Sequence, residues 1–457
     1  MKRVTNFVVI VAVVISLAAC LMAEEPTAAE TTARRELPKI PKLNFTDTRL
    51  ENGLRVIIAP EHTAPVYGLC IIYSVGSRNE RPGRTGFAHL FEHMMFQGSE
   101  NVGKGEHLIL VSRNGGDANG TTDQDRTVYY ETFPKNQLDL GLFLEADRMR
   151  SLAITQNSLD NQRNAVQEER RLRIDNQPYG RSFLEQRNLS YDNFAYKHST
   201  IGSMDDLNAA TVQDVAEFFR TYYAPNNAVL VIVGDLDPSD TLVHVKKYFG
   251  AVPPQPAPPA IDLKEPEHYG ERREIIYDPQ AKLPSVDITY IAAPGNTPDE
   301  YALQVLGIIF GRGASSRLYQ RLVKEKQVAT EASAFPDERI GPGLFSVSAT
   351  PSPGVKPDAV EQAIDDEIAT LQKTGVTDEE IDRARAVYLR QFINQRRSDT
   401  STAYRLAEST IKFNDPNLFN MVDDKIKAVT AADVLAAARK YLVRNERTVI
   451  LTLPADK

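Results

Sequence analysis

The 457-residue sequence has no tryptophan and only two cysteines, Cys20 and Cys70. Two cysteines cannot form a disulfide framework, and Cys70, inside the apolar stretch 66–75, is most simply a small buried side chain. Basic residues are also few, since 53 Lys and Arg face 61 Asp and Glu, and they are scattered along the chain. A nucleic-acid groove needs a concentrated basic face, so this function is excluded. The chain exceeds the usual size of one hydrophobic core, which predicts two domains.

The N-terminus has the pattern of an export signal. Lys2 and Arg3 precede an apolar run over 7–19, which is shorter than the roughly 20 residues that cross a bilayer. The run ends in Leu-Ala-Ala-Cys, which resembles the bacterial lipobox and predicts acylation of Cys20. The alternative is an ordinary signal peptide. We therefore expect a bacterial periplasmic protein that contacts the membrane only through a lipid anchor.

Composition and an internal repeat divide the rest of the chain. Residues 211–236 resemble residues 430–455, because each segment opens with T-x-x-D-V and ends in a β-branched strand. This repeat predicts a duplicated α+β fold, in which each half is a mainly antiparallel sheet with helices packed on it. The predicted parts are a signal peptide (1–20), a flexible tether (21–44), a first domain (45–250), a proline-rich linker (251–268) and a homologous second domain (269–457).

The stretch 86–99, GFAHLFEHMMFQGS, places two histidines four residues apart. On a helix, His89 and His93 share one face and can bind one metal ion, with Glu92 beside them. The order H-x-x-E-H is the inverted-zincin signature. The alternative is a pair of core histidines, but burying two histidines and a glutamate without partners would be costly.

A catalytic zinc ion usually has three protein ligands, so a third must lie elsewhere. In the helix predicted over 157–174, Glu169 lies on the arc of Leu159, Ala165, Val166 and Leu172, while Glu168 points the opposite way. An inward carboxylate needs a partner, which is either the metal ion or one of the nearby arginines, Arg163, Arg170, Arg171 or Arg173.

These motifs together resemble the pitrilysin and mitochondrial processing peptidase family of zinc peptidases. Further matches are 115–134, 164–180 and 313–326. The resemblance implies one Zn²⁺ per chain, bound by His89, His93 and Glu169, with Glu92 as the general base. It also implies two halves that close like a clam-shell around peptides or unfolded protein segments. The family's substrate-edge region corresponds to Asn119 and the strand 126–133, which includes Thr127 and Tyr129.

The second half departs from this pattern. Leu303, Leu306 and Gly307 occupy the positions of the zinc motif, so this half is expected to bind no metal. Val323 and Thr330 replace an Arg and a Tyr with which many relatives grip substrate. This absence predicts a heterodimer with a homologous, metal-free subunit that carries the clamp, the alternative being a homodimer or monomer.

Two further points concern the first half and the activity. Gln162 stands where relatives often have a second glutamate, which weakens any role proposed for that position. A non-catalytic scaffold subunit of the same fold is the competing function.

Overall fold

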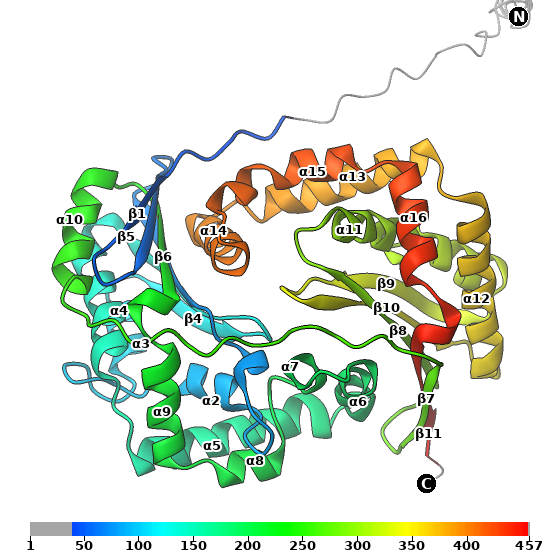
Figure 1. The fold of residues 1–457 in the computed structure, drawn as a ribbon, viewed down its shortest axis with the longest axis horizontal. Helices are drawn as coiled ribbons and strands as arrows, with labels where there is room; N and C mark the ends of the chain where they lie inside the picture. The colour runs from blue at the N-terminus through cyan, green and yellow to red at the C-terminus, as the bar shows by residue number, and fades with distance from the viewer. Residues whose placement is uncertain (1–38, 456–457) are drawn as a thin grey trace, which may run out of the picture. The chain divides into compact units, whose positions relative to one another are not determined.

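Two β-sheets organise the residues that the computed structural model describes, 39–455 (Figure 1). The first sheet has the strand order β1-β2-β6-β3-β5-β4. Only β2 and β6 run parallel, and all other neighbours are antiparallel. The strands are β1 (Thr46–Arg49), β2 (Arg55–Pro60), β3 (Val66–Tyr73), β4 (Asp117–Thr122), β5 (Thr127–Pro134) and β6 (Ala228–Gly234).

The second sheet repeats the first without an equivalent of β1. Its order is β7-β11-β8-β10-β9, and again one pair, β7 and β11, is parallel. The predicted duplication and the mainly antiparallel sheets are therefore confirmed. The strands are β7 (Arg272–Asp278), β8 (Ser285–Pro294), β9 (Ala329–Asp337), β10 (Pro342–Pro351) and β11 (Arg447–Pro454).

The helices follow the same repeat. Thr211 and Thr430 form matching capping boxes with Asp214 and Asp433, so the two T-x-x-D-V segments start equivalent helices, α9 and α16. The helices of the first half are α2 (Phe87–Met94), α3 (Glu106–Arg113), α4 (Leu138–Ser151), α5 (Gln156–Arg170), α6 (Gly180–Ser190), α7 (Phe194–Lys197), α8 (Met204–Ala209), α9 (Val212–Tyr222) and α10 (Pro238–Phe249). Those of the second half are α11 (Pro298–Gly311), α12 (Pro357–Thr374), α13 (Asp378–Asn394), α14 (Asp399–Phe413), α15 (Val422–Ala428) and α16 (Ala431–Tyr441).

The two halves exchange helices. Helix α14 of the second half packs on β3, β5 and β6 of the first sheet, and α6 of the first half packs on β7, β8 and β11 (Figure 1). The contact of α14 with β3 is so close that a side chain at Gly68 would collide with the backbone of Thr400. Cys70 is fully buried in this layer, beside Ala403 and Leu406, as expected for a small apolar side chain. Each sheet is thus covered on one face by the other half of the chain.

Two further sequence predictions concern the segment between the halves and the N-terminal region. Residues 253–269 contain no helix or strand, as their prolines predict. Cys20 and the signal segment lie outside the described residues. Within 39–455, none of the helices combines the length and the apolar character needed to span a bilayer.

Candidate metal centre and active site

The H-x-x-E-H motif lies on α2, whose apolar residues anchor it in the first core. Phe87, Leu90, Phe91 and Met94 are buried there, while His89, Glu92 and His93 project toward α5 and β4. The buried carboxylate of Glu80, which the sequence did not single out, fixes the start of this helix. It accepts hydrogen bonds from the backbone N–H groups of Gly86 (2.9 Å) and Ala88 (2.8 Å). These contacts satisfy free N–H groups at the helix N-terminus and so fix the position of the motif.

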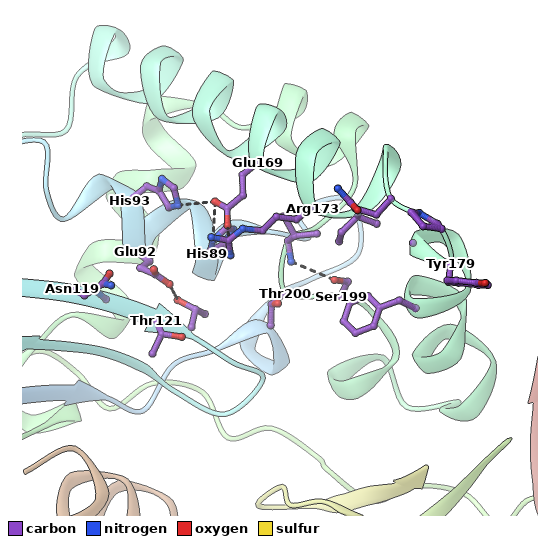
Figure 2. A pocket seen from close by; sticks show the side chains of 18 residues that line it. His89, Glu92, His93, Asn119, Thr121, Glu169, Arg173, Tyr179, Ser199 and Thr200 are labelled. Atoms are coloured by element: carbon purple, nitrogen blue, oxygen red, sulfur yellow. Dashed lines mark hydrogen bonds and ion pairs between the residues drawn. The ribbon is translucent and has the colours of Figure 1, made fainter. Parts of the chain in front are cut away.

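Helix α5 brings Glu169 to the two histidines, as predicted (Figure 2). Glu169 Oε2 lies 3.6 Å from His89 Nε2 and 3.3 Å from His93 Nε2. One donor atom from each of the three residues lies within 4.8 Å of the others. Two imidazoles and a carboxylate are a ligand set of catalytic zinc enzymes, which keep a fourth position for water. The residues present therefore fit a zinc ion.

The surroundings shift the pKa values of the two histidines in opposite directions. Burial and, to a smaller extent, the nearby His93 lower the pKa of His89 to about 4, so His89 is neutral at pH 7. Burial lowers the pKa of His93, but the contacts with Glu169 and Glu92 outweigh burial and raise its pKa overall. Gln162 Oε1 lies 3.3 Å from His93 Nδ1, which suits a tautomer that donates from Nδ1 and leaves the Nε2 lone pair free. The sequence comparison had weakened a role for Gln162, yet its amide oxygen contacts the second histidine directly.

Glu92 stands beside these ligands, and β4 holds its carboxylate. The hydroxyl of Thr122 donates a 2.6 Å hydrogen bond to Glu92 Oε2, which leaves Oε1 for another partner. Burial raises the pKa of Glu92, and the Thr122 hydrogen bond opposes that shift. Thr122 could not be predicted from the sequence, because it reaches Glu92 only through the packing of β4 beside α2.

The prediction that the strand over 126–133 forms the substrate edge was wrong, because this strand is β5, which lies inside the sheet. Strand β5 lies between β3 and β4, and Thr127 and Tyr129 are fully buried. Thr127 supports the site from behind, since its hydroxyl lies 3.4 Å from that of Thr122. The edge strands of the first sheet are β1 and β4, and β4 carries Asn119 at the cavity.

A π-helical turn over Arg171–Asp175 directly follows α5, the helix that carries Glu169. The turn changes the helical phase, so Ile174 is buried and Leu172 is 57 % exposed, contrary to the predicted arc. Ala165, also on that arc, is exposed, whereas Leu159 and Val166 are buried as expected. The turn also brings Arg173 Nη1 to 2.9 Å from Glu169 Oε1. Glu169 therefore contacts the two histidines of the candidate metal site and also one of the arginines that the sequence offered as partners.

A cavity of about 880 Å³ opens over these groups. All of its lining residues belong to the first half, and neither Val323 nor Thr330 is among them. In the second half, Leu303 and Leu306 are buried in an apolar core. The lining consists of His89, Glu92, His93, Asn119, Gly120, Thr121, Thr122, Glu169, Arg173, Ile174, Gln177, Pro178, Tyr179, Gly180, Phe183, Ser199, Thr200 and Ile201.

Comparison with known proteins identifies the family. Residues 55–198 match the model of the insulinase peptidase family M16, and residues 209–388 match that of the peptidase M16 inactive domain. The chain is 30% identical to the zinc protease PqqE of Helicobacter pylori over 429 residues, 93% of this chain and 95% of that protein. The chain belongs to the M16 peptidase family.

Solved structures agree with this assignment to M16. A protease from Helicobacter pylori has a TM-score of 0.86 and 29% identity, and the match covers 90% of this chain and all of that one. The first half of the periplasmic protease PqqL from Escherichia coli shares the fold with a TM-score of 0.73 at 21% identity, over 90% of this chain and 92% of that one. The predicted M16-type two-half fold is thus confirmed.

Proposed function

We propose that the chain is a zinc-dependent endopeptidase that hydrolyses peptides or unfolded protein segments. The observation that supports this function best is the convergence of His89, His93 and Glu169, with Glu92 beside them, in one cavity. A non-catalytic scaffold subunit would not need these four side chains in this arrangement. A purely structural zinc site would be closed by a fourth protein ligand, whereas three candidate ligands converge here among residues 39–455.

Each residue has a separate role in the proposed reaction. A Zn²⁺ ion held by His89, His93 and Glu169 would act as a Lewis acid and lower the pKa of water toward about 7. Glu92 takes the proton from the attacking water and passes it to the leaving amine. The open edge of β4, with Asn119, offers backbone groups to an extended peptide.

The test separates the ligands from the base. Glu92→Gln is expected to abolish hydrolysis of an unfolded peptide while zinc content stays at one ion per chain. His89→Ala and Glu169→Ala are expected to lose both the metal and the activity. The matched control is Glu168→Gln, because Glu168 points outward and pairs with Arg171 at 3.0 Å. Full activity of Glu92→Gln would refute the mechanism.

The missing clamp supports a proposal about the partner. Neither Val323 nor Thr330 can supply the donors of the Arg and Tyr of many relatives, and none of the described residues of the second half lines the cavity. We infer a heterodimer in which a homologous, metal-free subunit supplies them. The chain purified alone, with full zinc content, should turn over an unfolded peptide slowly. Rapid turnover that is unchanged by the candidate partner would instead favour the homodimer or monomer.

We also propose that the protein is exported and attached to the membrane by a lipid anchor at Cys20. The related protein PqqL is described as periplasmic, and the N-terminal pattern of this chain is that of an exported lipoprotein. Cys20→Ala should release the protein from the membrane fraction. Mass spectrometry that shows an unmodified N-terminus beyond Cys20 would contradict the anchor.

A further inference from the structure

Arg173 is the only lysine or arginine among the described residues that line the cavity. Its side chain is 75% exposed, although its Nη1 contacts Glu169 at 2.9 Å. Figure 2 shows it beside His89, reaching over the cavity from the π-helical turn. A guanidinium has five N–H donors in a planar fork, so one contact with Glu169 leaves several donors for another group.

The charges of the site leave Arg173 without full compensation once a metal is bound. Within this group the two carboxylates, Glu92 and Glu169, balance the two charges of a divalent cation. Glu169 is then shared between the cation and Arg173, and no other acidic side chain forms an ion pair with Arg173 among residues 39–455. The cavity therefore has one positive charge in excess beside the candidate metal site. This charge is the guanidinium of Arg173, whose planar shape suits the two oxygens of a carboxylate.

We propose that Arg173 binds a carboxylate of the peptide substrate, and so makes the enzyme select acidic peptides. The carboxylate is either an Asp or Glu side chain near the scissile bond or the peptide's C-terminus. This inference rests on the proposed peptidase function. It also supplies, from the first half, a cationic contact that Val323 and Thr330 cannot provide.

The competing role for Arg173 is structural. The guanidinium could serve only to orient Glu169 toward the metal, as partners of metal ligands often do. In that case its removal would lower zinc content or slow the hydrolysis of all peptides by the same factor. Peptide selectivity therefore distinguishes the two roles.

The experiment uses the zinc-loaded full chain and matched unfolded peptides. One series carries Glu or Gln at successive positions around the cleavage site, and a second series has free or amidated C-termini. Wild-type protein should cleave the peptide with the carboxylate about tenfold faster in kcat/KM, at one or two adjacent positions. Arg173→Gln should abolish that preference with zinc content unchanged, and Arg173→Lys should keep part of it.

Arg171→Gln is the matched control, because Arg171 lies two residues away and pairs with the outward Glu168. It should keep the wild-type preference. Binding of the same peptides to Glu92→Gln, with and without Arg173→Gln, provides a readout that does not depend on turnover. Equal losses on all peptides, or wild-type cleavage without any preference for a carboxylate, would overturn the role of Arg173. Failure of wild-type protein to cleave any peptide would instead count against the peptidase function.

Discussion

The hydrogen bond from Thr122 to Glu92 gives a sharp test of how the fold prepares the general base. Thr122→Val replaces the hydroxyl with a methyl group of similar size and leaves the β-branched shape that suits strand β4. The variant should bind zinc normally, because Thr122 is not one of the candidate ligands. Its defect should therefore appear in the chemical step.

The size of the defect follows from the contact. The Thr122 hydroxyl lies 2.6 Å from Glu92 Oε2, and both side chains are partly buried. A hydrogen bond to a charged group contributes about 1.5–3 kcal/mol. If the loss of this hydrogen bond raises the activation free energy by the same amount, kcat should fall by roughly 10- to 150-fold, since each 1.4 kcal/mol corresponds to about a factor of ten.

The assay compares kcat, KM and zinc content for three variants. Thr122→Ser keeps the hydroxyl and should restore most of kcat. Thr121→Val is the matched control, because Thr121 also lines the cavity, whereas the hydrogen bond to Glu92 comes from Thr122. The reasoning fails if Thr122→Val has wild-type kcat, or if Thr122→Ser is equally impaired.

Three further predictions concern the metal and the buried charges. Removal of metal with a chelator should abolish hydrolysis, and Zn²⁺ but not Mg²⁺ should restore it, as an activity titration would show. Burial raises the pKa of Glu145 to about 7 and of Glu131 to about 6, in a cluster with Arg148 and His107. Because both carboxyl pKa values are raised, the folded state holds these protons more tightly than the unfolded state, so the contribution of these two groups to stability should fall as pH rises from about 4.5 to 7. Glu131→Gln should flatten that fall in thermal melts. Arg447 is fully buried and pairs with Glu271, Glu361 and Asp365, so Arg447→Leu should lower the free energy of unfolding by about 3–5 kcal/mol in urea titrations. Arg444 is an exposed partner of the same Asp365, so Arg444→Leu should change this free energy by less than about 1 kcal/mol.

Local sequence patterns predicted the elements of this fold well. The T-x-x-D-V segments start equivalent helices, because a threonine N-cap and an aspartate three residues later satisfy each other's backbone groups within one turn. The spacing of His89 and His93 puts both on one helical face for the same reason, since it depends only on the 3.6-residue period. The inward position of Glu169 was predicted from the 3.6-residue period of its own helix.

The predictions failed where the hydrophobic pattern of a segment does not determine its structure. Leu172 is exposed because a π-helical turn breaks the period on which its burial was predicted. Thr127 and Tyr129 are buried because β4, not β5, forms the edge of the sheet. Alternation along a strand shows which residues share a face, but the order of strands depends on which neighbours pair.

The candidate ligands and the duplication could be predicted from residue identity and from spacing within single helices or strands. The role of Glu92 and the missing clamp residues came from the resemblance to a family of zinc peptidases. The contacts of Thr122 with Glu92 and of Gln162 with His93, and the position of Arg173 at the cavity, are known from the tertiary structure alone. Each of these contacts joins elements whose approach is fixed by core packing and strand order, and such distances are set by the whole chain and not by any segment of it.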